Sequence, residues 1–472
     1  MNEKSKQPEA TKEVPAPEIR YVNLYESEEK VYTRRITGYF QRLRRYVSAP
    51  LMLGFLLMPW LVIDGRPAML FDLPARQFNI LWMTFSPQDG VYLAWLLIIS
   101  AFLLFTVTVM VGRVWCGFTC PQTIWTQMFM WAEFLCEGDR NKRIKLDSQK
   151  LSLEKVLRKS AKHFIWVAIA LVTAMTFVGY FTPIRELATG FFTFDLDLTA
   201  LFWVLFFTGA TYGNAGFMRE QVCKYMCPYA RFQSVMYDQE TLAVWYNKER
   251  GEKRGPRKPN EDYKAQGLGD CIDCSWCVQV CPVNIDIREG LQAECIDCGL
   301  CIDACDSVMD KMNYPRGLIS FTTEEAAAKK KVKIIRPRVL GYGFVLLAMV
   351  SVFVYSLATR MPLVVEVIRD RGTQMYKIVD GNVSNVYTIK IENLDRKTHV
   401  YDVTVNGDFT FDVQGYKAPP VLEGEILNLP IRVVTKRSEL KGEKNTITFK
   451  VVARENPDVL VLRSTTFIGP SK

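Results

Sequence analysis

Histidine is scarce in this chain of 472 residues, where only His163 and His399 occur. A histidine-rich metal site is therefore excluded, and so is a membrane haem, which usually needs pairs of histidine ligands. No C-x-x-C-H motif for covalent haem attachment is present either. Cysteine, in contrast, occurs thirteen times, and no cysteine follows Cys305. Any metal chemistry in this chain is therefore expected to rest on cysteine.

Long apolar stretches without charge indicate a membrane protein, because a spanning helix needs about 20 apolar residues. A cleavable signal peptide is not expected, since a polar segment precedes the first apolar run. We predict five spans, of which the first is the weakest because it contains Pro50 and Pro59. The predicted spans are 46–63, 91–112, 164–184, 198–218 and 339–359.

Lysine and arginine are unevenly distributed between the connections of these spans. Ten precede residue 46 and ten lie in 113–163, whereas 64–90 has two and 185–197 has one. The positive-inside rule therefore predicts a multi-pass membrane protein with a cytoplasmic N-terminus, a cytoplasmic cysteine-rich segment and a C-terminus outside the cytoplasm. This placement accounts for most of the net charge of +9, so no nucleic-acid partner is expected.

The uncharged stretch 114–132 would invert the downstream topology if it were a sixth span. Polar residues such as Gln122 and Gln127 dilute it, and its large apolar residues recur at three- and four-residue steps. We therefore expect an amphipathic helix that lies in the interface or against the bundle. Its expected apolar face consists of Ile124, Trp125, Met128, Trp131 and Leu135.

The regions outside the membrane differ in composition. About seven short runs of alternating β-branched residues after the last span predict an immunoglobulin-like β-sandwich, which we expect to be a docking or structural module. Its lack of cysteine suits an oxidising compartment. The expected divisions are a cytoplasmic tail (1–45), the bundle (46–240), a charged linker (241–266), the cysteine domain (267–320), a basic juxtamembrane segment (321–338), the last helix (339–359) and the sandwich (360–472).

Eight cysteines form two runs with the same spacing, C-x2-C-x2-C-x3-C, at 271–281 and 295–305. This spacing is typical of bacterial two-cluster ferredoxins, in which the fourth cysteine of each run ligates the other [4Fe–4S] cluster. Zinc and disulfides are the alternatives, but zinc sites usually separate two knuckles by a longer spacer, and disulfides are disfavoured in the cytoplasm. The expected ligand sets are Cys271, Cys274, Cys277 and Cys305 for one cluster and Cys281, Cys295, Cys298 and Cys301 for the other.

Two further cysteine pairs form an internal repeat, C-x3-C-P, after the second and the fourth expected spans. They are Cys116 with Cys120 and Cys223 with Cys227. Because proline suits the first position of a helix, we expect Cys120 and Cys227 at helix N-caps, where the helix dipole favours a thiolate. Soft thiolates select Cu(I), zinc or iron–sulfur centres. Packing at helix ends would explain one pair, but the repetition favours a redox or metal role. Cys136 is expected to be structural.

These motifs resemble the CcoG family, also called FixG or RdxA, which are cytochrome c oxidase accessory proteins. The resemblance extends over essentially the whole chain and rests on "CGFTCPQTIW", "CKYMCPYARFQS", the two cysteine runs, the last helix and the β-rich end. It implies a role in assembling the cbb3-type haem–copper oxidase, with copper chaperones and oxidase assembly factors as partners. It also implies reduction of Cu(II) to Cu(I) at the membrane. Older descriptions of the family proposed a cation pump.

The expected architecture is a multi-domain membrane protein: an α-helical bundle of about five spans, an inserted 2[4Fe–4S] ferredoxin domain and a C-terminal immunoglobulin-like sandwich. The expected activity is that of a cupric reductase, with Cys116, Cys120, Cys223 and Cys227 as copper ligands. The alternative is a non-enzymatic electron relay or assembly subunit. A pump would need ionisable residues inside the spans, which the five windows lack. The electron donor, a role for quinol and the formation of a homo-oligomer stay open.

Overall fold

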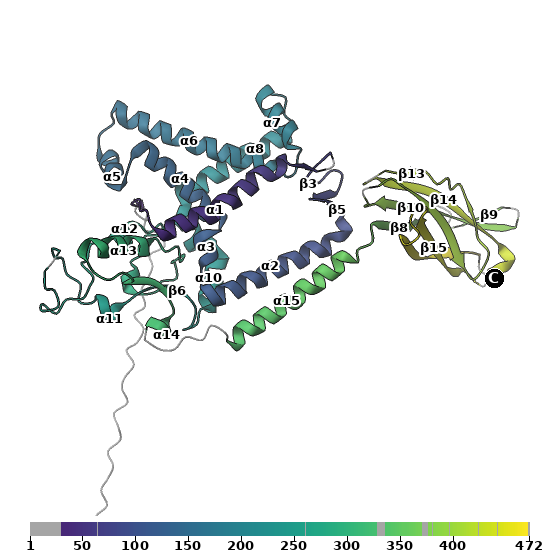
Figure 1. Ribbon diagram of the computed structural model, residues 1–472. Coiled ribbons are helices and arrows are strands. Elements are labelled where there is room, and N and C mark those ends of the chain that lie inside the picture. Colours follow the sequence, from purple (N-terminus) through teal and green to yellow (C-terminus); the bar gives the residue numbers. More distant parts are fainter. Residues whose placement is uncertain are drawn as a thin grey trace, which may run out of the picture.

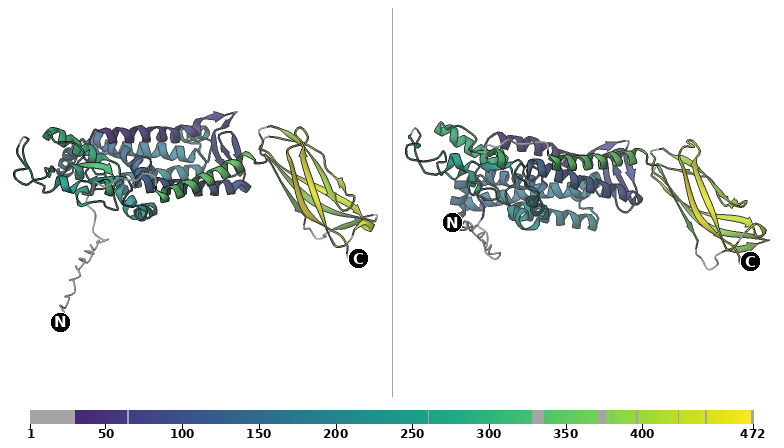
Figure 2. Two further views of the ribbon diagram at one scale, coloured as in Figure 1. Left: turned by 60° about the horizontal axis from the view of Figure 1, so that its bottom comes forward. Right: turned by 90° about the horizontal axis from the view of Figure 1, so that it is seen from below.

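The structure is a computed structural model. It describes residues 30–63, 65–259, 261–327, 336–370, 376–379, 381–395, 397–422, 424–440 and 442–470. The expected tail (1–45) is therefore described only from residue 30, and residues 328–335 of the expected basic segment lie outside the described residues. A helical bundle occupies the middle of the molecule, with the cysteine domain at one end and the β-rich C-terminal domain at the other (Figures 1 and 2).

Two groups of helices form the bundle. In one, α2 (Gly90–Val111) lies along α15 (Pro337–Ala358), and in the other, α6 (Leu153–Val178) packs against α4 (Pro121–Glu137) and α8 (Leu198–Gly213). The other helical segments are α1 (Tyr39–Leu57), η1 (Met58–Trp60), η2 (Pro87–Asp89), α3 (Val114–Phe118), α5 (Arg140–Ser148), α7 (Ile184–Thr193), the π-helical η3 (Asn214–Met218) and η4 (Val222–Met226), α9 (Arg219–Gln221) and α10 (Pro228–Met236).

The structure does not reproduce five spans. Among the described residues, three helices are long and apolar enough to cross a membrane, namely α2, α6 and α15, and a fourth span results if α7 and the segment 198–226, bent by 91°, count as one. The expected span 46–63 is not confirmed: α1 ends at Leu57, η1 follows it to Trp60, and the first turns of α1 carry Arg42, Arg44 and Arg45. Charged residues at the start of α1 leave too short an apolar part for an ordinary span.

The connection between α1 and α2 is ordered, which sequence analysis did not predict. It contains β1 (Val62–Ile63), β2 (Arg66–Pro67), and a three-stranded antiparallel sheet of β3 (Met69–Asp72), β4 (Gln77–Ile80) and β5 (Met83–Phe85). This sheet contacts the C-terminal domain, because Gln77 donates a hydrogen bond to the Gly424 carbonyl. Arg360, which follows α15, forms an ion pair with Asp89, which precedes α2.

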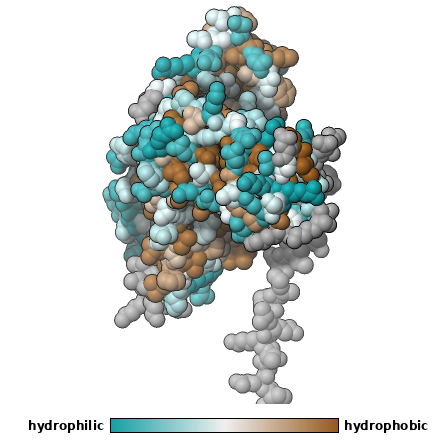
Figure 3. Space-filling model, turned by 90° about the vertical axis from the view of Figure 1, so that its right-hand side faces the viewer, coloured by the Kyte–Doolittle hydropathy of each residue, from teal (hydrophilic) through white to brown (hydrophobic). Residues whose placement is uncertain are grey.

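The C-terminal β-domain, residues 363–468, contains nine strands in the part of the chain that the structure describes. Two antiparallel sheets, ordered β12-β14-β10-β8, with β9 paired to β10, and β13-β11-β15-β16, share one apolar core. Viewed from this end, apolar residues form separate patches between hydrophilic ones (Figure 3). The strands are β8 (Leu363–Arg369), β9 (Lys377–Val379), β10 (Asn382–Asn393), β11 (His399–Gly407), β12 (Asp412–Gln414), β13 (Pro420–Val421), β14 (Ile426–Lys436), β15 (Lys444–Ala453) and β16 (Leu460–Ile468).

The cysteine domain begins earlier than the sequence suggested. The expected linker, 241–266, starts with β6 (Ala243–Tyr246), which pairs antiparallel with β7 (Ile319–Thr322), so the two strands close the domain at its ends. The boundary differs because a run of charged residues follows this strand in the sequence, whereas the strand residues Ala243, Val244 and Tyr246 are themselves buried. The remaining elements are α11 (Lys248–Gly251), α12 (Trp276–Gln279), η5 (Ile287–Glu289), α13 (Leu300–Met312) and α14 (Glu324–Ala327).

The segment 114–132 lies against the bundle, as expected, and Ile124 of the expected apolar face is buried, but the rest of its buried face differs. Two helices, α3 and α4, replace one, and Trp131 and Leu135 are exposed. Phe129, Ala132 and Glu133 are buried instead, and Glu137 lies on the same face of α4. Carboxylates on this face are tolerated because cations from three other helices reach them.

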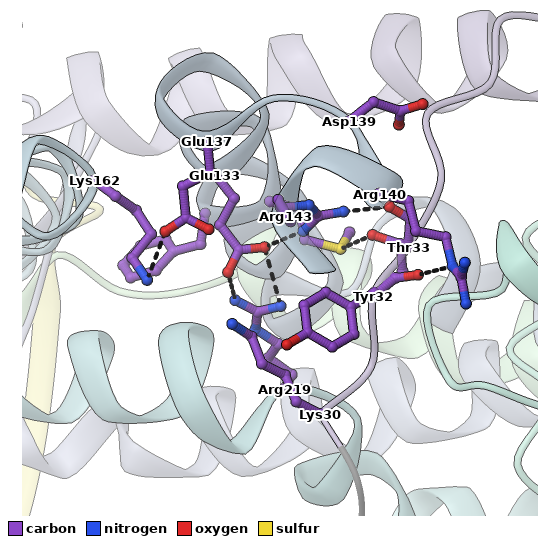
Figure 4. Close-up of polar contacts among 12 residues, drawn as sticks. Lys30, Tyr32, Thr33, Glu133, Glu137, Asp139, Arg140, Arg143, Lys162 and Arg219 are labelled. Carbon is purple, nitrogen blue, oxygen red and sulfur yellow. Dashed lines mark hydrogen bonds and ion pairs between the residues drawn. The ribbon is translucent and has the colours of Figure 1, made fainter. Parts of the chain in front are cut away.

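Glu133 lies at the centre of a buried ion-pair network (Figure 4). Its carboxylate accepts hydrogen bonds from Arg143 of α5 at 2.6 Å and from Arg219 of α9 at 2.5 Å. Glu137, one turn later, pairs with Lys159 at 3.0 Å and with Lys162 at 3.2 Å, both on α6. Burial opposes ionisation, but the guanidinium groups of Arg219 and Arg143 hold the pKa of Glu133 below its usual range. The network therefore joins four helices at the end of the bundle that faces the cysteine domain.

Replacing Glu133 with Gln should destabilise the protein strongly, because it leaves two buried guanidinium groups without a counter-charge. Breaking such a pair costs about 3–5 kcal/mol, so the thermal unfolding midpoint of the detergent-solubilised protein should fall clearly. Glu154→Gln is the matched control, since Glu154 pairs with Arg158 at 2.8 Å on the surface of α6. An exposed pair contributes within about 1 kcal/mol. Equal unfolding midpoints for the two variants would contradict a stabilising network at Glu133.

Candidate functional site: two cysteine-lined cavities and a pair of cysteine boxes

The two cysteine runs adopt the same backbone conformation. In each run, the residue before the second cysteine and the residue after it have positive φ: Asp273 and Ser275 in the first, Asp297 and Gly299 in the second. These left-handed residues curl the chain, so that three cysteines of one run approach a common centre. The sequence repeats accordingly, as "CIDCSWC" and "CIDCGLC". Two equivalent loops are thus built for two equivalent groups.

Each loop borders a cavity that also receives a cysteine from the other run. The first cavity is lined by Cys271, Cys274, Cys277 and Cys305. The second is lined by Cys281, Cys295, Cys298 and Cys301, and Cys277 borders it as well, so the two cavities are neighbours. The structure therefore brings together the same two sets of four cysteines that the spacing predicted.

Apolar side chains complete both cavities. Val308, Leu318 and Ile319 line the first, and Val283, Ile285 and Ile296 line the second. Four thiols in an apolar shell are the donor set of a [4Fe–4S] cluster, so the residues present fit two such groups. Each cluster, when bound, supplies one-electron redox chemistry.

The C-x3-C-P boxes come together beside this domain. Cys120 is the N-cap of α4 and Cys227 the N-cap of α10, which confirms the expected helix starts. The thiols of Cys120, Cys223 and Cys227 all lie near enough to the Cys116 thiol for their charges to raise its pKa. Among the described residues, however, no three His, Cys, Asp or Glu side chains converge on the position of a single metal ion. The four box thiols are thus gathered, but not closed around one ion.

Two polar side chains join the two boxes. The Cys116 thiol lies 3.5 Å from Oε1 of Gln233 on α10, and Gln233 is fully buried. Gln122 on α4 donates to the carbonyl of Asn214 at 3.1 Å and to that of Arg219 at 3.3 Å, in the π-helical break before the second box. Burial raises the pKa of the Cys116 thiol to about 12. Cys116 is therefore protonated at neutral pH until a metal ion displaces its proton.

The first box lies directly on the second cysteine loop. A Cβ atom on Gly117 would lie 2.6 Å from the Ile296 carbonyl oxygen and 3.0 Å from Cα of Cys298. Only glycine allows this approach, since real Cβ atoms do not come so close. Cys116 accordingly packs against the apolar cluster that contains Cys295 and Cys298. The box and the second cavity are thus separated by little more than one backbone layer.

Sequence analysis missed the charged residue Asp297, which holds this junction together with Arg113. Asp297 is fully buried and accepts hydrogen bonds from the backbone N–H of Arg113 at 3.0 Å and from the Tyr237 hydroxyl at 2.7 Å. The Arg113 guanidinium donates to the carbonyls of Ala230 on α10 and Ala293 in the cysteine domain. The repeated Ile-Asp-Cys of the two runs was the one signal that pointed to Asp297.

Three family models match parts of the chain. Residues 93–145 match a 4Fe-4S binding domain, and residues 218–324 match a 4Fe-4S dicluster domain. Residues 353–470 match the IG-like fold at the C-terminal of FixG. The first match contains the box of Cys116 and Cys120, and the second contains the other box and both cysteine runs.

Curated relatives resemble the chain over most of its length. The nitrogen fixation protein FixG of Rhizobium meliloti strain 1021 is 37% identical, over 81% of this chain and 80% of its own. Protein RdxB of Cereibacter sphaeroides is 36% identical, over 86% of this chain and 88% of its own. Protein RdxA of the same organism is 36% identical, over 81% and 84%, respectively.

Single serine substitutions should distinguish the two ligand sets. Cys305→Ser should remove one of two clusters and lower the iron content from about eight to about four atoms per chain, since each cubane holds four. Cys281→Ser should do the same to the other cluster, although Cys281 lies in the run of Cys271 and Cys277. Iron analysis and EPR spectra of the anaerobically purified variants measure this, and Cys136→Ser is the control. Zinc in place of iron in the reconstituted parent would contradict the cluster assignment.

Proposed function

The chain belongs to the family of FixG, RdxA and RdxB, and we propose a specific reaction for this iron–sulfur redox protein at the membrane. The protein reduces Cu(II) to Cu(I) for assembly of a cbb3-type cytochrome c oxidase. Cys271, Cys274, Cys277 and Cys305 hold one [4Fe–4S] cluster, and Cys281, Cys295, Cys298 and Cys301 hold the other. The box cysteines Cys116, Cys120, Cys223 and Cys227 hold the copper ion that is the substrate.

The close approach of Gly117 to the loop at Ile296 and Cys298 is the observation that carries this proposal. It sets the Cys116 thiol beside the cavity that Cys298 lines, with no solvent layer between the two backbones. The electron route then follows the protein, from the first cavity through the shared Cys277 to the second cavity, and from there to the first box. Each Cu(II) ion takes one electron, which an external donor supplies through the cysteine domain.

The box thiols suit copper in its reduced state. Thiolates are soft ligands and prefer Cu(I) over hard divalent ions. The boxes supply two pairs of such thiols, Cys116 with Cys120 and Cys223 with Cys227. Because the bound ion displaces the proton of Cys116, copper binding weakens as the pH falls.

The proposed orientation follows from the charge distribution and suits the architecture. The cysteine domain and the β-domain lie at opposite ends of the bundle, joined by α15 (Figure 1). With the basic end inside, the cysteine domain faces the cytoplasm and the β-domain the periplasm. Copper chaperones and oxidase assembly factors are the proposed partners, and the β-domain is a docking module for them.

The second candidate function is an electron relay or assembly subunit that passes electrons between protein partners and binds no copper. The first box lies in a segment that matches a 4Fe-4S binding domain, and an iron–sulfur group held by the four box thiols would favour this relay. A cation pump is disfavoured, because α2 contains no acidic or basic side chain, α15 has one only at its start, Arg338, and those of α6 end at His163, in its first half.

Replacing Cys116, Cys120, Cys223 and Cys227 together with serine should abolish copper binding and spare the two clusters. Copper bound per chain should fall at least about tenfold, because a hydroxyl is a harder and far less acidic ligand than a thiolate. Metal analysis after incubation with copper, together with Cu(II) reduction by the pre-reduced protein, measures the effect. Cys136→Ser is the control with an unpaired cysteine.

Two outcomes would overturn the copper assignment. A quadruple variant that binds and reduces copper like the parent would place the copper site elsewhere. A quadruple variant that loses about four irons, the content of one cubane, would assign an iron–sulfur group to the boxes and support the relay.

Gly117→Ala should slow copper reduction without removing either cluster or the copper ligands. The new methyl group forces the Ile296 carbonyl and the box apart by several tenths of an ångström or more. Because a misplacement of about 1 Å can slow a reaction by about a hundredfold, this smaller shift should slow the reduction roughly fivefold. Stopped-flow reduction of Cu(II) measures the rate, and iron and copper contents should equal those of the parent. Gly209→Ala in α8, where a Cβ meets nothing within 4 Å, is the control. A normal rate in Gly117→Ala would exclude this contact from the electron route.

A further inference from the structure

We propose that a pocket between the bundle and the cysteine domain binds the headgroup of an anionic phospholipid. The pocket has a volume of about 520 Å³ and is walled by α1, α4 and the loop at Val280 and Pro282. It adjoins the second cysteine-lined cavity, since Leu300 lines both, and the inference does not depend on copper reduction.

The charge of the pocket indicates an anion. Five arginines line it and no carboxylate does: Arg34, Arg35, Arg44, Arg45 and Arg143. Two of these guanidinium groups are already engaged, since Arg44 donates to the Gly117 carbonyl at 2.9 Å and Arg143 pairs with Glu133 at 2.6 Å.

Three arginines remain for a ligand. Arg34 lies 3.7 Å from the ring centre of Trp276, and Arg35 lies 4.4 Å from that of Phe134. Neither guanidinium group forms an ion pair within the described part of the chain, nor does that of the exposed Arg45. Guanidinium groups recognise phosphate through paired hydrogen bonds, so a phosphate group suits this end of the pocket.

The other wall of the pocket is apolar and indicates an acyl chain. Met52 of α1 and Ile124, Met128, Trp131 and Phe134 of α4 contribute to it. Trp131 is 55% exposed, and Leu51, Leu53 and Leu135 are exposed on the same two helices. A charged end and an apolar wall together match the two halves of a phospholipid, whereas a free phosphate would make no use of the apolar wall.

The position of the pocket selects a membrane lipid. Basic pockets beside membrane helices bind the headgroups of anionic lipids, and tryptophan is enriched where the membrane meets water. A lipid at this point contacts α1, α4 and the loop that carries Cys281. It would therefore link the cysteine domain to the bundle next to the first box, where Arg44 donates to the Gly117 carbonyl.

Native mass spectrometry of the full-length protein in detergent tests the proposal. Phosphatidylglycerol and cardiolipin should bind more tightly than phosphatidylcholine with the same acyl chains. Arg45→Gln should weaken binding of the anionic lipids about fivefold, which is the contribution of one basic residue near an anionic headgroup. Arg42→Gln is the matched control, because Arg42 lies on the same helix but does not line the pocket.

The outcomes separate the possible ligands. Equal binding of phosphatidylcholine, or equal effects of the Arg45 and Arg42 substitutions, would overturn the proposal. Displacement of the lipid by millimolar inorganic phosphate alone would show that the pocket recognises a free anion, which would overturn it as well. Unchanged iron content in each variant confirms that the cysteine domain has kept its fold. The single variant Arg35→Gln removes a different guanidinium group from the same pocket and should also weaken binding of the anionic lipids.

Discussion

The carboxylate of Asp297 is fully buried where the cysteine domain meets the bundle, and besides the Cys295 thiol at 3.6 Å three N–H or O–H groups donate hydrogen bonds to it. They come from the backbone N–H of Arg113 at 3.0 Å, the Tyr237 hydroxyl at 2.7 Å and the backbone N–H of Val244 at 3.1 Å. A buried carboxylate is costly unless each acceptor position is used, so these partners cannot separate independently. Gly112 permits the contact, because a Cβ there would lie 2.8 Å from Oδ2 of Asp297. This one side chain therefore fixes the positions of the first box, of α10 and of β6 relative to one another.

A second carboxylate of the cysteine domain acts on the bundle in the same way. Asp303 on α13 accepts hydrogen bonds from the backbone N–H groups of Phe40 at 3.1 Å and Gln41 at 2.8 Å, the first residues of α1. A negative charge at this point satisfies free N–H groups and complements the helix dipole. Gly299 makes room for the ring of Phe40. The cysteine domain is therefore attached to the bundle by more than its chain connections. Asp303 caps the start of α1, and Asp297 accepts the backbone N–H of Arg113 in the turn after α2.

Local spacing made the cysteine chemistry predictable. The two runs, the crossed ligand sets and the N-cap positions of Cys120 and Cys227 depend on residues close together in sequence, and the structure reproduces the grouping. The strands of the β-domain were visible because alternation is also local. Pairings between distant parts of the chain were not predictable. Asp297 accepts a hydrogen bond from Arg113, which is 184 residues away in sequence. The burial of Glu133 is explained only by its ion pair with Arg219. The five-span count was not confirmed for a related reason, because α1 carries arginines, one of which, Arg44, donates to the Gly117 carbonyl of the first box.

The two boxes repeat in sequence but are not equivalent in the structure. Position two of the first box is Gly117, and the same position of the second is Lys224. Since even a methyl group at Gly117 would lie 2.6 Å from the Ile296 carbonyl, a lysine there would exclude the cysteine loop altogether. Only the first box can therefore lie against the second cavity, while the second box approaches from the far side, through Gln233 and Cys116. The internal repeat thus supplies two similar pairs of thiols, and a single glycine decides which pair lies against the second cysteine loop.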